Sequence, residues 1–232
     1  MTIAVFLSIW STTKSSTDLD IYFRGAALDV LRKDEHVKRV EIYTPEPGDV
    51  PLMDDVPSPS LILQVDMDQA EQARALTESE EFKRHLLNRD KIDPGMEELK
   101  LEITEVRNFP LAGQQVAPPR TAPLSFVVRY YGPVADACEF ADFYQRNHPP
   151  ILANFPGLCN VLCYLPLGWN ESGKVDDSRL IIGNEVVFED LAALKNALDS
   201  DVIKEAKKDS SQFQDFGYST HHAMHRELVY QR

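Results

Sequence analysis

The sequence predicts an α+β protein made of two tandem copies of one βαββαβ unit. Three segments of the first half align with three segments of the second half, in the same order and at nearly one offset. At a shift of 121 residues (164 − 43), Tyr43 falls on Tyr164 and Pro45 on Pro166. A period close to half the chain length indicates a duplicated unit. The aligned segments are 36–45 with 157–166, 61–67 with 180–188, and 70–87 with 191–208.

The first copy, residues 1–110, shows the expected alternation of apolar runs and helical patterns. A helix capped by Thr17 or Asp18 follows the first strand, and its apolar residues recur at helical spacing. The proline- and aspartate-rich stretch 45–58 is predicted to be a loop. The predicted strands are 3–10, 37–43, 60–67 and 99–106, and the second helix is 69–87.

The second copy, residues 124–232, repeats this order after a linker at 111–123 that contains three prolines and no periodicity. Its first helix is expected to break at His148, because the residue before a proline is disfavoured in the helical region. The predicted strands are 124–131, 158–165, 179–188 and 218–228, and the helices are 134–147, with a further turn to 154, and 191–208.

A βαββαβ unit is the ferredoxin-like arrangement, in which both helices cover one face of a four-stranded antiparallel sheet. A sheet covered on one face only should alternate apolar and polar residues, yet runs such as 126–131 are apolar on both faces. We therefore expect the two sheets to pack together and to close an intramolecular α+β barrel.

Composition excludes several partner classes. The chain of 232 residues has 24 basic and 37 acidic side chains, a net charge of −13, which disfavours nucleic acid and anionic membrane surfaces. Three cysteines do not suit a disulfide framework, and Cys159 and Cys163 would lie about 13 Å apart along a strand. The expected location is the cytoplasm, and the expected partner is a small molecule. The chain is predicted to be a monomer (a pseudo-dimer) or a homodimer.

The main candidate catalytic group is His148, which stands at the predicted helix break. An imidazole with a pKa near 6.5 is suited to proton transfer at neutral pH. The equivalent position of the first copy is Ala27, so only the second copy carries this group. A capping or surface histidine is the alternative interpretation.

The last strand carries His221, His222 and His225. Side chains alternate along a strand, so His221 and His222 point to opposite faces, and either one could face a pocket. His221 and His225 lie about 13 Å apart, too far to bind one metal ion together. We therefore predict no metal and, because no glycine-rich phosphate loop is present, no nucleotide cofactor.

Further candidate residues lie on neighbouring predicted strands and helices. Tyr130 and Tyr131 point to opposite faces, and one of them could donate a hydrogen bond to a ligand oxygen. Asn184 interrupts an apolar strand, where a buried amide needs a partner or a ligand. Tyr144 on the helix and Trp169 in a loop are the remaining candidates for substrate binding.

The stretch from Glu139 to Val161 resembles the EthD family of dimeric α+β barrel proteins, and the run 187–200 is similar to a later stretch of that family. The resemblance covers residues 124–228 well and 3–110 weakly. It implies a barrel that members normally build as dimers, here fused in one chain. The matching positions are Glu139, Phe140, Phe143, His148, Pro150, Pro156, Gly157 and Leu158.

Related small barrels include isomerases, lyases and cofactor-free monooxygenases. The leading hypothesis is a cofactor-independent lyase or isomerase acting on a small aromatic, lactone or polyketide-like molecule. His148 would be the acid or base, assisted by Tyr131 or Tyr130 and by His221 or His222. A cofactor-free monooxygenase of a phenol and a non-catalytic binding or assembly barrel are the alternatives. Heme-binding barrels of the chlorite dismutase type have a similar length, but their histidine context differs from His148-Pro149-Pro150.

Overall fold

A computed structural model describes residues 1–48, 50, 57–167 and 179–232. The elements of the first half are β1 (Thr2–Ser11), α1 (Ser16–Tyr22), η1 (Phe23–Ala27), α2 (Leu28–Lys33), β2 (Arg39–Pro45), β3 (Leu61–Met67), α3 (Ala70–Glu78), α4 (Glu80–Phe82), η2 (Lys83–Leu87), α5 (Arg89–Ile92) and β4 (Met96–Phe109). Those of the second half are β5 (Leu124–Val134), α6 (Ala137–Leu152), β6 (Leu158–Pro166), β7 (Leu180–Phe188), α7 (Leu191–Leu198), α8 (Val202–Ser210) and β8 (Phe216–Gln231).

Hydrogen bonds join the strands in the order β1-β3-β2-β8-β5-β7-β6-β4, and this order closes on itself as a barrel. The predicted α+β barrel is therefore confirmed. Within it, β4-β1-β3-β2 and β8-β5-β7-β6 each have the strand order of a ferredoxin-like sheet. None of the described helices is long and apolar enough to cross a membrane.

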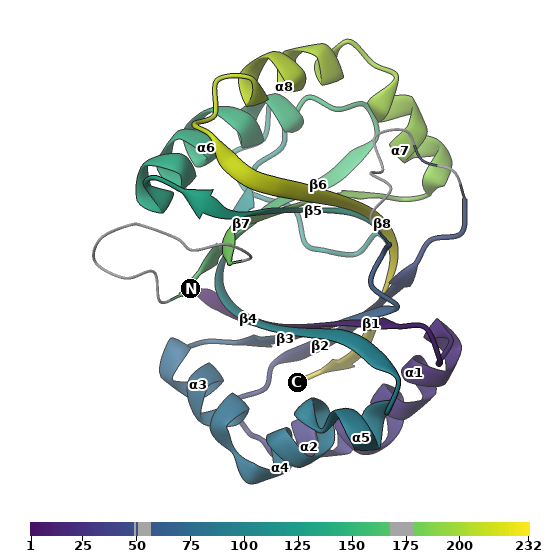
Figure 1. The fold of residues 1–232 in the computed structure, drawn as a ribbon. Coiled ribbons are helices and arrows are strands. Elements are labelled where there is room, and N and C mark those ends of the chain that lie inside the picture. Colours follow the sequence, from purple (N-terminus) through teal and green to yellow (C-terminus); the bar gives the residue numbers. More distant parts are fainter. Residues whose placement is uncertain (49, 51–56, 168–178) are drawn as a thin grey trace. The chain divides into compact units, whose positions relative to one another are not determined.

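The chain divides into two compact units. Unit 1 contains Met1–Pro45, Pro57–Glu105 and His225–Arg232, and unit 2 contains Val106–Met224 together with the described residues that directly follow Pro45. Strand β8 thus contributes residues to both units. In unit 1, helices α1 to α5 cover one face of the strands, and in unit 2 helices α6, α7 and α8 do so (Figure 1).

The strand register repeats between the units at a shift of 121. In unit 1, Ile3 pairs with Met67, and in unit 2 the pair is Leu124 with Phe188, each residue 121 positions later (124 − 3 and 188 − 67). The β2–β3 and β6–β7 ladders agree in the same way, because Arg39 pairs with Asp66, while Asn160 pairs with Val187. Equal register across both ladders supports a duplicated unit.

A buried polar pair occupies the same place in both units. In unit 1 the Tyr43 hydroxyl donates to Gln64 Oε1 over 2.6 Å, and in unit 2 the Tyr164 hydroxyl donates to Glu185 Oε2 over 2.5 Å. Tyr164 follows Tyr43 by 121 residues (164 − 43), and Glu185 follows Gln64 by the same number (185 − 64). Glu185 also accepts from the Ser125 hydroxyl over 2.5 Å, so its two oxygens are both used. The strand faces that carry these pairs are therefore polar as well as buried.

Three local predictions for the first half are wrong. Ser15, not Thr17 or Asp18, caps the first helix, because it accepts from the Asp18 amide in a reciprocal capping box. The predicted helix 69–87 is interrupted at Ser79, whose side chain accepts from the Phe82 amide and starts a new helix. Strand β4 is longer than 99–106 at both ends.

Candidate functional site

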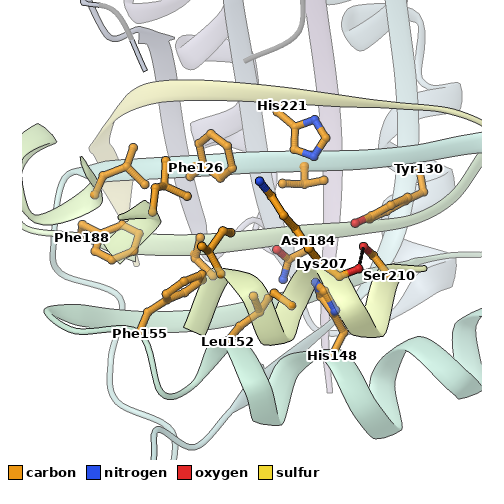
Figure 2. A pocket seen from close by; sticks show the side chains of 16 residues that line it. Phe126, Tyr130, His148, Leu152, Phe155, Asn184, Phe188, Lys207, Ser210 and His221 are labelled. Carbon is orange, nitrogen blue, oxygen red and sulfur yellow. Dashed lines mark hydrogen bonds between the residues drawn. The ribbon is translucent and has the colours of Figure 1, made fainter. Parts of the chain in front are cut away.

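A cavity of about 240 Å³ lies in unit 2 between the helices and the strands. Strand β5 contributes Phe126, Val128 and Tyr130 to its lining, and β7 contributes Asn184, Val186 and Phe188. Side chains alternate across a strand, so each of these sets of three belongs to one face. Figure 2 shows Phe126, Phe155 and Phe188 at one end and His148, Tyr130 and Ser210 at the other. The other lining residues are Leu152, Leu194, Leu198, Ile203, Ala206, Lys207 and His221.

Helix α6 brings His148 to this cavity. The helix begins after Asp136, whose carboxylate accepts from the amides of Cys138 and Glu139. The predicted break at His148 is wrong, because α6 continues through both prolines to Leu152. Tyr144, His148 and Leu152 are buried at four-residue spacing, and the packing of that face outweighs the local preference against a helical residue before proline.

The His148 ring is held by a carboxylate from another helix. Its Nδ1 donates to Asp209 Oδ2 on α8 over 2.7 Å, and both side chains are only 8% exposed. A hydrogen bond at Nδ1 fixes the tautomer, so that Nε2 carries the lone pair. Burial lowers the pKa of His148 below its ordinary value of 6.5, and Asp209 partly offsets this effect. At neutral pH the ring is therefore uncharged and can accept a proton.

Aromatic rings pack against the His148 imidazole. The Tyr144 ring lies 4.9 Å and the Phe213 ring 5.4 Å from the imidazole, centroid to centroid. Tyr130 packs edge-on against Tyr144 at 5.4 Å. Burial raises the pKa of Tyr130 and that of Tyr144 above their ordinary value of 10. Both phenols remain protonated at neutral pH, so each keeps a hydrogen-bond donor.

Polar groups also reach the cavity from the strands and from α8. The Asn184 amide is fixed by donating to the Leu162 carbonyl over 3.1 Å. His221 on β8 lies beside Phe126, with their rings 5.9 Å apart. From α8, the Ser210 hydroxyl donates to the Lys207 carbonyl over 3.0 Å, and this bond is drawn in Figure 2.

The structure brings together some of the sequence-predicted site residues. His148, Tyr130, Asn184 and His221 line the same cavity, and Tyr144 borders it through its contacts with two of them. Tyr131 and His222 are buried but do not line the cavity. Tyr131 instead stacks on Tyr218, with a ring distance of 4.9 Å. Trp169 lies outside the described residues.

Sequence reasoning missed Asp209, Lys207 and Ser210. Asp209 follows His148 by 61 residues, and only the packing of α8 against α6 brings the two side chains together. One signal was present, since Asp209 stands one turn after Ala206 on the buried face of an otherwise charged helix. Among the described residues, no group of three or more His, Cys, Asp or Glu side chains could hold a metal ion.

Comparison with solved structures shows likeness over nearly the whole chain. An anthrone oxidase-like protein matches with a TM-score of 0.63 and 14% identity, covering 98% of this chain and 93% of that one. A putative monooxygenase from Lactobacillus acidophilus NCFM matches with a TM-score of 0.55 and 11% identity, covering 98% and 95%. A mutant chlorite dismutase from Candidatus Nitrospira defluvii matches with a TM-score of 0.52 and 12% identity, covering 96% and 91%.

Fold and site together define an α+β barrel protein with an apolar cavity, lined by a histidine that is paired with an aspartate outside the lining. At identities of 14%, 11% and 12%, the likeness to these solved structures shows the fold alone. No protein-family model matches the chain. No curated protein sequence matches it.

Proposed function

We propose that this protein is a cofactor-independent enzyme that removes a proton from a small aromatic, lactone or polyketide-like molecule. One observation carries the proposal: an uncharged His148, held at Nδ1 by Asp209, lines an apolar cavity. A neutral imidazole that is oriented by a carboxylate and lines a cavity is a suitable general base. An engineered apolar cavity of about 150 Å³ can hold benzene, so a cavity of about 240 Å³ has room for a larger ring system.

The chemistry would begin at a carbon acid beside a carbonyl group. His148 Nε2 takes the proton, and the negative charge that forms moves to the carbonyl oxygen as an enolate. The Tyr130 phenol, whose high pKa keeps it protonated, and Asn184 are the polar groups proposed to face that oxygen. Return of the proton to a different carbon completes an isomerisation, and expulsion of a leaving group completes an elimination. Asp209 acts as a positioning residue through His148.

We also propose membership of the EthD-like family, which rests on the stretch around His148. The glycine of its proline-glycine-leucine motif, Gly157, has a φ of +73°, a backbone conformation that residues other than glycine rarely adopt. That turn leads directly into β6. In this proposal, the proline-glycine-leucine motif forms the turn before β6, and the histidine of the same stretch supplies the base.

Oxygenation is the second candidate, and the names of two structural neighbours favour it. In such a reaction the same base forms a carbanion, which O₂ oxidises. For anthrone, one O₂ yields anthraquinone and one water. Both candidates share the proton abstraction by His148, and they differ in their need for oxygen.

Hydrogen exchange in D₂O tests the shared step. We would incubate the protein under argon with a panel of enolisable aromatic ketones and lactones that includes anthrone, and measure deuterium uptake by mass spectrometry. His148→Gln should lower the enzymatic exchange rate by about 10²–10⁴-fold, which is the usual contribution of a general base. His225→Gln, at an exposed histidine of β8, is the matched control and should exchange like the wild type.

Two outcomes would contradict the proposal. Either exchange is not accelerated with any member of the panel, or His148→Gln retains the full rate. Repeating the reaction in air, with an oxygen electrode, separates the candidates. Oxygen consumption that depends on His148 identifies the oxygenase, whereas an unchanged oxygen level with product formation identifies the isomerase or lyase.

A further inference from the structure

Among the described residues that line the cavity of unit 2, one is a lysine, Lys207, which stands at the opening. Lys207 is exposed on α8, yet it lines the cavity together with the buried Ala206 beside it. In Figure 2 its side chain extends from α8 toward the strands, on the side that carries Phe126 and His221. Its ammonium group can therefore contact a ligand bound in the cavity.

The Lys207 ammonium forms no hydrogen bond or ion pair with the described part of the chain. The nearby Lys204, by contrast, donates to Asp201 over 2.7 Å. No Asp or Glu is among the described residues that line the cavity, and the carboxylate of Asp209 is bonded to His148. The positive charge at the opening is thus not neutralised by the cavity itself.

Apolar side chains make up most of the remaining lining, and they include the rings of Phe126, Phe155 and Phe188. A ligand that suits this cavity combines a flat apolar body with one anionic group at the end near Lys207. The overall charge of −13 gives no general attraction for anions, so any preference for an anionic ligand must come from local groups.

We propose that the substrate is an aromatic or polyketide-like carboxylate whose anionic group is bound by Lys207. This inference rests on the proposed function, because it assigns a substrate class to the same cavity. Lys207 is here a specificity residue, and His148 acts at a separate point on the ligand.

The test compares two ligands of nearly equal shape and different charge, 2-naphthoate and 2-naphthamide, by titration calorimetry with the full chain. We expect the wild type to bind the carboxylate about tenfold more tightly, as a charge-assisted contact would provide. Lys207→Met should reduce this preference to less than about twofold while leaving the affinity for the amide unchanged. Lys208→Met, at an exposed neighbour that does not line the cavity, should keep the preference.

Salt gives a second readout, since a contact at an exposed opening is screened. Raising the NaCl concentration from about 0.05 to about 0.5 M should weaken binding of the carboxylate and leave binding of the amide unaffected. The Debye length falls from about 10 Å at 0.1 M salt toward about 3 Å at 1 M salt, so added salt shortens the range over which the two charges attract each other. The proposal is overturned if the wild type binds both ligands equally, binds neither, or keeps its preference in Lys207→Met.

His148→Gln separates this proposal from the proposed function. The variant should still prefer the carboxylate, because Lys207 is unchanged. A preference that depends on Lys207, without any turnover that depends on His148, would refute the proposed catalysis and support the assigned ligand class.

Discussion

The aspartate behind His148 offers the sharpest test of the proposed base. Asp209→Asn keeps the size of the side chain and removes its charge. In the wild type, the 2.7 Å contact with a carboxylate can only be donated by Nδ1, so Nε2 carries the lone pair. An asparagine can also donate to Nδ1, which would move the proton to Nε2 and leave the cavity without a base.

The structure sets the size of the effect. A hydrogen bond to a charged group contributes about 1.5–3 kcal/mol, and each 1.36 kcal/mol corresponds to tenfold in rate. If Asp209→Asn loses the hydrogen bond between the carboxylate and His148 in the transition state, the exchange rate should fall by about 10- to 150-fold. The rate should fall further if the substitution also changes the tautomer of His148. The substitution also removes the one influence that raises the pKa of His148, so this pKa should fall. Activity requires the neutral ring, so the pH at which it is lost on acidification should move lower.

Two measurements check this reasoning. Nitrogen-15 NMR of the imidazole reports its tautomer and titration without any substrate, and deuterium exchange reports the rate. Asp199→Asn, at an exposed helix end that is not part of the cavity lining, is the control. A variant with an unchanged tautomer, an unchanged titration and a full exchange rate would show that Asp209 does not position His148.

Two further predictions concern stability. Tyr164→Phe should lower the free energy of unfolding by about 2 kcal/mol, because the Tyr164 hydroxyl donates to the carboxylate of Glu185. Tyr43→Phe should lower it by about 1 kcal/mol, because the Tyr43 hydroxyl donates to the neutral amide of Gln64. Urea unfolding of both variants tests this ranking, and an equal or reversed order contradicts it. The free energy of unfolding should also decrease as pH falls through about 6.5. Below this pH the unfolded chain binds a proton at His148, whereas the native state does not, because burial lowers the pKa of His148 there. His148→Gln should flatten this part of the stability profile, and an unchanged slope would show that another group is responsible.

Much of the fold could be predicted from the sequence because the duplication is visible in it. The pair Tyr43 and Tyr164 fixed a shift that the strand registers of both units follow. The local errors arose where side chains compete with periodicity. Ser79 ended a helix that its neighbours would have continued, and the packing of His148 kept a helix that Pro149 alone would have ended.

The candidate site was predictable only in part, for a geometric reason. Alternation along β5 placed Tyr130 and Tyr131 on opposite faces but could not say which face met the helices. His221 and His222 left the same choice open. The helical pattern around Asp209 could indicate that it is buried, but its pairing with His148 depends on how α8 packs against α6, and no local pattern encodes that arrangement.

Strand β8 also sets the order in which the chain can complete its parts. Unit 1 includes His225–Arg232, and these residues leave the ribosome only after all of unit 2 has been made. Domains synthesised first generally fold first. Here, however, the earlier unit is completed only after the later one, so a ribosome that stalls near residue 200 would hold a nascent chain whose first unit has its four sheet strands but still lacks the segment His225–Arg232.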